Sequence, residues 1–192
     1  MSELESAARA VPPDAAPVVF YGSSSIRLWD TLAADLPGVP TLNLGFGGST
    51  LAACARYFER LVVRRRPRAV LLYAGDNDLG NGRSPEDVLD AFRDLAAQSE
   101  RLLGPTPLAF LSIKPSPARW AIDAQIRRAN ELVRAETEAR PACEFLDVYP
   151  RMLGPDGMPR RELYADDGLH LSKVGYGLWA AFLRGGWARR FL

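Results

Sequence analysis

The sequence predicts an α/β fold in which a parallel β-sheet lies between two layers of helices. Five short apolar runs alternate along the chain with longer segments of helical periodicity. Each run is almost continuously apolar, as expected for strands that helices cover on both faces. This repeated alternation of strand and helix favours a three-layer α/β/α sandwich with right-handed crossovers.

The predicted strands are short and are spread along the whole chain. They are Val18–Tyr21, Thr41–Leu44, Ala69–Tyr73, Leu108–Ile113 and Phe145–Val148. Runs of this length, bounded by glycine, proline and polar residues, are typical of strands rather than of helices. We expect one five-stranded parallel sheet with the flavodoxin-like strand order 2-1-3-4-5.

Helix signals lie between and after these runs. Ser84 and Pro85 suit the N-cap and the first helical position, and the acidic residues behind them suit the positive end of a helix. Apolar residues at helical spacing then predict three helices: one with Val88, Phe92 and Leu95; one with Ile122, Ile126, Ala129 and Val133, stopped by Pro141; and one with Val174, Leu178 and Phe182 on one face, capped by Ser172.

Length and composition indicate one ordinary globular domain. The chain has 192 residues, 47% of them hydrophobic and 24% charged, with a formal net charge of +1. This balance gives no reason to expect nucleic acid or an anionic membrane surface as a partner. We expect residues 1–16 to form a flexible arm and residues 17–192 to form the single domain.

Signals of export, membrane insertion and metal binding are missing from the sequence. No basic start with an apolar run follows Met1, and no segment approaches the ~20 apolar residues that span a bilayer. Cys54 and Cys143 have the spacing of neither a disulfide framework nor a zinc site. We therefore expect a cytoplasmic protein without a metal or a cofactor.

Polar residues gather where the predicted strands end. In parallel sheets, functional sites lie beyond the carboxyl ends of the strands. The ranges 22–27, 43–50 and 75–78 follow the first three strands and are rich in Gly, Ser, Asn and Asp, and the range 167–170 reads Asp-Gly-Leu-His. Together, these fragments predict a site at that edge of the sheet.

Three side chains have the chemistry of a serine hydrolase. His170 is the single histidine of the chain, so imidazole acid–base chemistry near neutral pH depends on it. Asp167 is close enough to bond one ring nitrogen and leave the other as a base. Ser24 lies in a strand-to-helix turn and would be the nucleophile, although Ser23 and Ser25 compete by composition. A capping or surface histidine and a polar N-cap cluster are the structural alternatives.

An oxyanion site can also be placed. The backbone N–H groups of Ser24 and Gly48 and the side-chain amide of Asn77 are candidate donors. Plain turns at the glycine and the asparagine are the structural alternatives.

The four fragments resemble the blocks of the SGNH (GDSL-type) hydrolase family, which supply Ser, Gly, Asn and His. The resemblance runs from about residue 17 to the final helix. The Gly-Asp-Ser block is matched by Gly22-Ser23-Ser24, and the Asn-x-x-x-x-Gly block by the range 43–48. The Gly-x-Asn-Asp block is matched by the range 75–78, and the Asp-x-x-His block by Asp167 and His170. The resemblance implies hydrolysis of carboxylic esters through an acyl-serine intermediate.

One position departs from the family pattern. Ser23 stands where the family has an aspartate before the nucleophile, so this chain lacks any contribution of that acid to the order of the loop. A rival architecture, the α/β-hydrolase, is disfavoured because its Gly-x-Ser-x-Gly elbow would need glycine where Ile26 stands.

The substrate and two other function classes remain open at this point. The short chain has no segment for a lid domain, so we expect a shallow pocket and a preference for short acyl groups. We also hypothesise that Trp120 forms one apolar wall of this pocket; packing of Trp120 in the core is the alternative. The family also includes carbohydrate O-deacetylases, lysophospholipases and arylesterases. The alternatives of other classes are a flavodoxin-like phosphate- or nucleotide-binding module and a catalytically inactive relative. A homodimer is an expectation at family level only.

Overall fold

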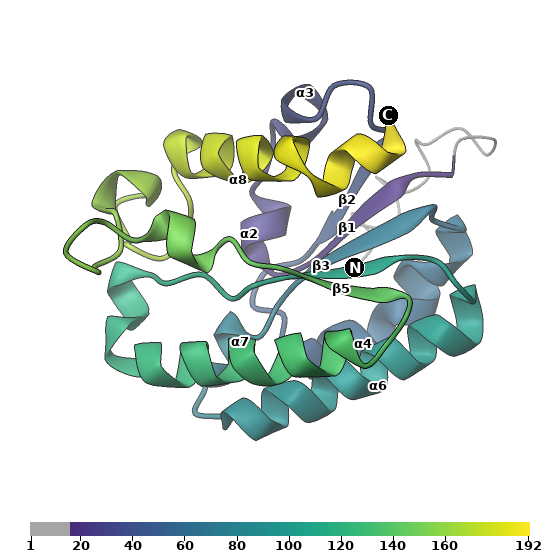
Figure 1. Ribbon diagram of the computed structural model, residues 1–192, viewed down its shortest axis with the longest axis horizontal. Coiled ribbons are helices and arrows are strands. Elements are labelled where there is room, and N and C mark those ends of the chain that lie inside the picture. The colour runs from purple at the N-terminus through teal and green to yellow at the C-terminus, as the bar shows by residue number, and fades with distance from the viewer. Residues whose placement is uncertain (1–15) are drawn as a thin grey trace.

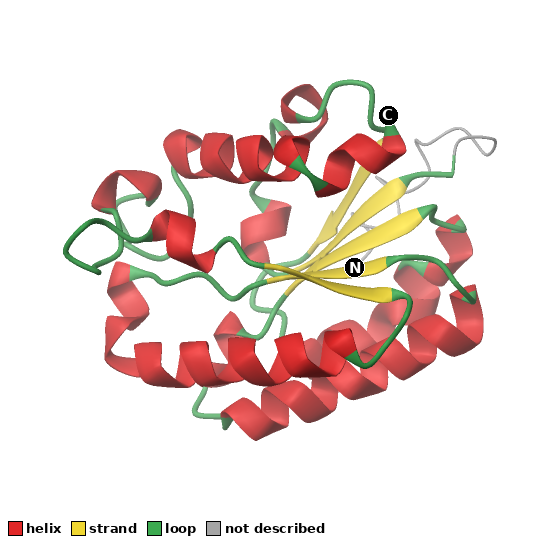
Figure 2. Ribbon diagram, in the orientation of Figure 1, coloured by secondary structure: helices red, strands yellow, loops and turns green. Residues whose placement is uncertain are grey.

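The protein forms a three-layer α/β/α sandwich around a five-stranded sheet (Figures 1 and 2). The computed structural model describes residues 16–192, so all but the last residue of the predicted N-terminal arm lies outside the described part. All strand pairs are parallel and the order is β2-β1-β3-β4-β5, which confirms the predicted fold class and order. The strands are β1 Val18–Gly22, β2 Thr41–Gly45, β3 Ala69–Tyr73, β4 Leu108–Leu111 and β5 Cys143–Leu146.

Helices cover both faces of the sheet (Figure 1). One face is covered by α4 (Leu51–Leu61), α6 (Pro85–Leu103) and α7 (Asp123–Glu138), and the other by α3 (Leu32–Asp35), α8 (Lys173–Gly185) and η5 (Trp187–Phe191). Shorter elements near the strand ends are α2 (Ser24–Arg27), α5 (Asp76–Gly80), η1 (Val63–Arg65), η2 (Pro117–Ile122), η3 (Tyr149–Met152) and η4 (Arg161–Leu163).

The continuous apolarity of the strands follows from their burial on both faces. In β1, Val19 and Tyr21 pack into the core under α4 and α6, whereas Val18 and Phe20 pack into the core under α8. All four side chains have an exposed fraction of 0%. Successive strand residues point to opposite faces, so a doubly covered strand needs apolar side chains at every position.

The ends of β4 and β5 differ from the predicted ranges, because side chains replace the strand ladder there. β4 stops at Leu111: the backbone N–H and C=O of Ile113 bond the amide of Asn130 instead, both at 2.8 Å. β5 ends two residues early, since the N–H of Val148 turns toward the Ser112 hydroxyl at 3.0 Å. An apolar run alone does not reveal which backbone groups a distant side chain will satisfy.

The last helix is capped as predicted but buries a different face. The Ser172 hydroxyl accepts from Gly175 N at 3.2 Å, and Ser84 forms a full capping box with Asp87 at the start of α6. Val174, which was expected on the apolar face of the last helix, is 56% exposed. The buried stripe of α8 instead carries Tyr176, Trp179, Ala180 and Leu183, because the large aromatic rings pack under the sheet.

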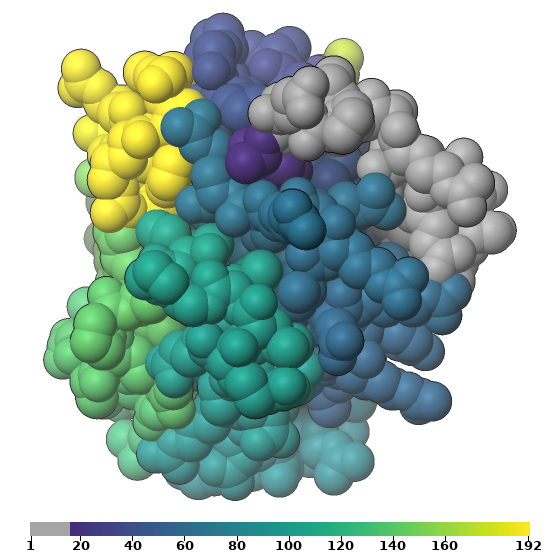
Figure 3. Space-filling model, turned by 90° about the vertical axis from the view of Figure 1, so that its right-hand side faces the viewer, coloured from purple at the N-terminus to yellow at the C-terminus, as the bar shows by residue number. Residues whose placement is uncertain are grey.

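All strands begin at one end of the sandwich and stop at the other. Figure 3 looks onto the end where the strands begin, with the entry into β1 in purple and the C-terminal residues in yellow. Arg68 Nη1 donates to Phe191 O at 3.3 Å and joins the C-terminal segment to this end. The predicted site residues follow the strands at the opposite end, where α2 begins (Figure 1). No helix within residues 16–192 combines the length and apolarity needed to cross a bilayer.

Candidate active site

Ser24 lies at the tight turn from β1 into α2. Gly22 makes this turn feasible: its φ is +129°, and a Cβ there would approach Tyr73 O to 1.9 Å. The next N–H, that of Ser23, donates to the same oxygen at 2.9 Å. Ser23 and Ser25 are each only 2% exposed, whereas Ser24 is half-buried. Of the three competing serines, the turn therefore presents Ser24 at the strand ends.

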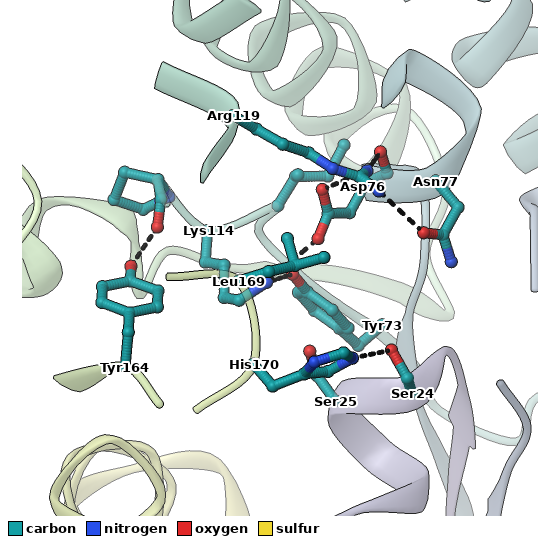
Figure 4. Close-up of polar contacts among 12 residues, drawn as sticks. Ser24, Ser25, Tyr73, Asp76, Asn77, Lys114, Arg119, Tyr164, Leu169 and His170 are labelled. Atoms are coloured by element: carbon teal, nitrogen blue, oxygen red, sulfur yellow. Dashed lines mark hydrogen bonds and ion pairs between the residues drawn. The ribbon is translucent and has the colours of Figure 1, made fainter. Parts of the chain in front are cut away.

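The structure brings Ser24, His170 and Asp167 together, and Figure 4 shows the contact between Ser24 and His170. His170 Nε2 lies 3.0 Å from Ser24 Oγ, across a sequence separation of 146 residues. His170 Nδ1 lies 2.5 Å from Asp167 Oδ2. A carboxylate accepts at Nδ1, so the ring proton lies on that nitrogen and Nε2 is left with a lone pair toward the hydroxyl. This is the geometry needed to remove the serine proton.

The loop that carries His170 is ordered by the same aspartate. Asp167 Oδ1 accepts from the backbone N–H groups of Leu169 and His170, both at 2.9 Å. Gly168 takes a φ of +66°, which closes the turn between acid and base. Ala165 N donates to His170 O at 2.8 Å and completes the loop. The carboxylate thus fixes the backbone through one oxygen and the imidazole through the other.

These hydrogen bonds also change the acidity of Asp167. The hydrogen bond from the His170 side chain has the largest lowering effect and the bond from the Leu169 backbone N–H the next largest; together they lower the pKa of Asp167 to about 2. The carboxyl group is half exposed, so the shift reflects direct hydrogen bonding rather than burial. Asp167 therefore stays ionised at every pH at which the enzyme is expected to work.

This ionisation predicts the shape of the acid limb of activity. The pKa of Asp167 is about 2, so Asp167 keeps its charge on moderate acidification and its protonation adds no step to the loss of activity there. We therefore expect log kcat/KM on an activated ester to fall with a slope no steeper than one down to about pH 4, where an ordinary aspartate would begin to take up a proton. A slope of two in that interval, with the fold intact by circular dichroism, would contradict the assignment.

The predicted oxyanion donors come from three separate segments, which follow β1, β2 and β3. Ser24 begins α2, so its N–H has no acceptor within the helix. Gly48 is exposed, and its φ of +68° is one that residues with a Cβ rarely adopt. Asn77 lies in α5 after β3, half-buried, and its Nδ2 donates to Ser49 O at 3.1 Å. Ser49 adjoins Gly48, so this bond ties the two oxyanion segments together.

Two charged groups beside Asn77 were missed by the sequence interpretation. Arg119 Nη2 donates to Asn77 Oδ1 at 3.1 Å, and Arg119 Nη1 also binds Asp76 Oδ1 at 2.6 Å. Lys114, wholly buried, donates to Asp76 Oδ2 at 3.0 Å (Figure 4). Both cations lie in the segment from Lys114 to Trp120, but their partners are about 40 positions away in the chain, and in this segment only Trp120 was considered for the site.

The serine that departs from the family pattern does not leave the loop loose. Ser23 O accepts from Ile26 N at 2.9 Å and from Arg27 N at 3.1 Å. Asn43 Nδ2 donates to Ile26 O at 2.6 Å, and the Tyr176 hydroxyl donates to Ser25 O at 3.0 Å. Backbone bonds and two side chains from other elements therefore hold the nucleophile turn where the family has an aspartate.

Trp120 lies in η2 and is half-buried, so it belongs neither to the fully buried core nor to the open surface. Its role as a pocket wall stays a prediction. We expect Trp120→Ala to change the relative kcat/KM values across a set of esters while leaving the thermal midpoint nearly unchanged. An unaltered substrate profile would remove this residue from the site.

The site has the arrangement of a serine hydrolase: a hydroxyl, an imidazole and a carboxylate follow one another in this order at the carboxyl ends of a parallel sheet. Among residues 16–192, no three His, Cys, Asp or Glu side chains are grouped as metal ligands would be. The order of the chain, with Ser24 first and Asp167 and His170 near the end, agrees with the family blocks found in the sequence.

Comparison with known proteins gives the family. Residues 15–178 match the GDSL-like Lipase/Acylhydrolase family. Platelet-activating factor acetylhydrolase IB subunit alpha1 of Bos taurus is 30% identical over 172 residues, which cover 83% of this chain and 69% of that protein. The chain therefore belongs to the GDSL-like lipase/acylhydrolase family and is an ester-hydrolysing enzyme.

Solved structures agree on the fold. A GDSL-like lipase from Bacteroides thetaiotaomicron superposes with a TM-score of 0.80 at 19% identity, covering 100% of this chain and 98% of that one. The acetyl xylan esterase AlAXEase superposes with a TM-score of 0.75 at 18% identity, covering 88% and 98%. Family membership excludes the alternative of a flavodoxin-like binding module without catalysis.

Proposed function

We propose that the enzyme hydrolyses short-chain acyl esters by two-step acyl transfer, with Ser24 as nucleophile, His170 as base and Asp167 as the residue that orients the base. The observation that carries this proposal is the 3.0 Å contact between His170 Nε2 and Ser24 Oγ, with Nδ1 held at 2.5 Å by Asp167. An inactive relative would have no need for this continuous line from carboxylate to hydroxyl.

In the first step, Ser24 Oγ attacks the ester carbonyl carbon while His170 Nε2 takes the hydroxyl proton. The carbonyl oxygen becomes an oxyanion, which the N–H groups of Ser24 and Gly48 and the amide of Asn77 stabilise. The C–O bond to the leaving alcohol then breaks, and the proton on Nε2 passes to the alcohol oxygen. The negative charge of Asp167 stabilises the positively charged imidazolium of His170 throughout this step.

In the second step, water cleaves the acyl-serine. His170 Nε2 takes a proton from the water as its oxygen attacks the acyl carbon, and the same donors stabilise the second oxyanion. Collapse expels Ser24 Oγ, which recovers the proton from Nε2. The acid is released, and the site returns to its starting state.

The openness of the site and the names of two similar proteins support a short-acyl substrate. Gly48 is exposed, His170 is 30% exposed and Asp167 is 49% exposed at the side chain, so the reacting groups lie near the surface. Two of the similar proteins are named for acetyl esters, an acetylhydrolase of platelet-activating factor and an acetyl xylan esterase. A shallow site of this kind gives little apolar surface to a long chain. O-acetylated carbohydrates and lysophospholipids are the alternative substrates for the same site.

A series of p-nitrophenyl esters tests this preference. We expect kcat/KM to be highest for acetate and butyrate and to fall as the acyl chain lengthens, because the additional methylenes stay in water. A rate that climbs from acetate to decanoate would contradict a short-acyl pocket. Acetylated xylan and a lysophospholipid, assayed in parallel, separate the two alternative substrates.

Rapid mixing tests the two-step reaction itself. Excess p-nitrophenyl acetate should release a burst of p-nitrophenol close to one equivalent per Ser24 if deacylation is the slower step, and intact mass should show the acetyl group on the enzyme at low pH. Release of product with no acyl-enzyme in either measurement, at several pH values, would contradict the proposal. Homodimer formation and a cytoplasmic location stay predictions from the sequence.

A further inference from the structure

Asn77 can stabilise an oxyanion only through its amide nitrogen, so its neighbours must fix which way the amide faces. Asn77 Oδ1 accepts from Arg119 Nη2, and Asn77 Nδ2 donates to Ser49 O, both at 3.1 Å. A guanidinium only donates and a carbonyl only accepts. The reversed amide would lose both bonds, and in the observed orientation one N–H of Nδ2 remains for a substrate.

Arg119 is itself anchored on a buried ion pair. Its Nη1 donates to Asp76 Oδ1 at 2.6 Å and also to the backbone O of Asp76. Asp76 is 5% exposed and pairs at 3.0 Å with the ammonium of Lys114, which is 0% exposed and donates to the Tyr73 hydroxyl at 3.1 Å. The guanidinium thus has a fixed place between the carboxylate and the amide (Figure 4).

The two ion pairs join Asp76 to both Lys114 and Arg119, so these three residues together carry one excess positive charge. Burial opposes the charge on Asp76, but Lys114 and Arg119 together hold its pKa below the usual value. Burial also opposes the charge on Lys114, and pairing with Asp76 raises its pKa above the usual value. Burial raises the pKa of Tyr73, so the phenol is neutral. Lys114 and Arg119 are therefore two cations against the one anion of Asp76, and Arg119 is the cation that contacts the Asn77 amide oxygen.

We propose that Arg119 is a positioning residue for the reaction: it holds the Asn77 amide with its nitrogen toward the reacting carbonyl oxygen and places positive charge behind it. Arg119 does not touch the substrate and acts through Asn77. A donor to the amide oxygen also polarises the amide and strengthens its N–H as a donor. This inference rests on the proposed function, because it concerns the oxyanion of that reaction.

Gly80 gives the guanidinium its space. A Cβ at Gly80, the last residue of α5, would lie 2.5 Å from both Arg119 Cζ and Nη1. Gly80 is exposed and does not need a positive φ, so the helix itself would accept alanine. Gly80→Ala therefore displaces Arg119 without removing any polar group. Gly177→Ala in α8, where nothing lies within 4 Å of the added Cβ, is the matched control.

The test compares kcat, KM and thermal unfolding across these variants on p-nitrophenyl acetate. We expect Arg119→Met to lower kcat about tenfold or more with KM within about threefold, as for a residue that orients a reacting group. Arg119→Lys should keep a cation on Asp76, and with it the thermal midpoint, but should recover only part of kcat, because an ammonium lacks the planar fork. Gly80→Ala should lower kcat as Arg119→Met does, and Gly177→Ala should not.

The Asn77→Ala background separates positioning from a general structural role. Ala118 N donates to Gly168 O at 3.1 Å, so damage to η2 would also reach the His170 loop. If Arg119 acts through Asn77, Arg119→Met changes kcat less than about twofold once Asn77 is alanine. The inference would be overturned if Arg119→Met lowered kcat as much in the Asn77→Ala variant as in the wild type, or if it did not lower kcat in the wild type. If Asn77→Ala itself leaves kcat unchanged, the oxyanion assignment in the proposed function fails, and the inference fails with it.

Discussion

Replacement of Ser24 by alanine should reduce kcat on an activated ester by a factor of about 10⁴ or more, because no acyl-enzyme can form without the hydroxyl. The structure singles out Ser24 among the three serines of the turn, because its Oγ lies 3.0 Å from His170 Nε2. Steady-state hydrolysis of p-nitrophenyl acetate by wild type and variant measures the loss.

Ser25→Ala is the matched control for this prediction. Ser25 adjoins Ser24 in the same turn but is only 2% exposed, and the bond that it accepts from Tyr176 uses its backbone oxygen, which alanine keeps. We expect Ser25→Ala to retain kcat within about an order of magnitude, since a buried hydroxyl beside the site affects packing rather than the reaction. Wild-type activity in Ser24→Ala, or equal losses in both variants, would contradict the nucleophile assignment.

Asn77→Ala should lower kcat by about 10²–10³, the usual cost of removing one oxyanion donor. KM should change much less, because the amide bonds the oxygen most strongly when that oxygen is charged. The variant also loses the 3.1 Å bond to Ser49 O, so thermal unfolding should be measured beside the kinetics.

Asn81→Ala is the control for the amide. Asn81 follows α5 directly and is exposed. We expect its replacement to leave kcat unchanged. A loss of kcat/KM in Asn77→Ala that comes from KM alone would indicate ground-state binding and would contradict an oxyanion role.

The sequence predicted the sheet well because the signal for a buried strand is local. The runs from Val18 and from Ala69 are apolar at every position, so periodicity and length placed β1 and β3 correctly. The ends of β4 and β5 depend on the side chains of Asn130 and Ser112, which replace ladder bonds from other parts of the chain. Helical spacing alone predicts Val174 on the buried face, but the larger Trp179 is buried on a different face of α8 and Val174 is exposed.

The same distinction holds for the site. Ser24, Asp167 and His170 could be found because each lies in a short fragment with recognisable chemistry at a strand end. Arg119 could not be found in this way, because its partner Asn77 is 42 positions away and nothing in the local sequence indicates the contact. Charged residues that act through a neighbour in space leave no periodic or motif signal, and they require the structure.

The proposed reaction depends above all on activation of Ser24 by the His170 imidazole. A fluorophosphonate probe tests it directly, because phosphorus reacts with an activated serine hydroxyl without any assumption about the natural substrate. We predict one equivalent of label, located on Ser24 by peptide mapping, with labelling absent in Ser24→Ala and greatly slowed in His170→Ala. Labelling at another residue, or undiminished labelling of Ser24 in His170→Ala, would contradict the account.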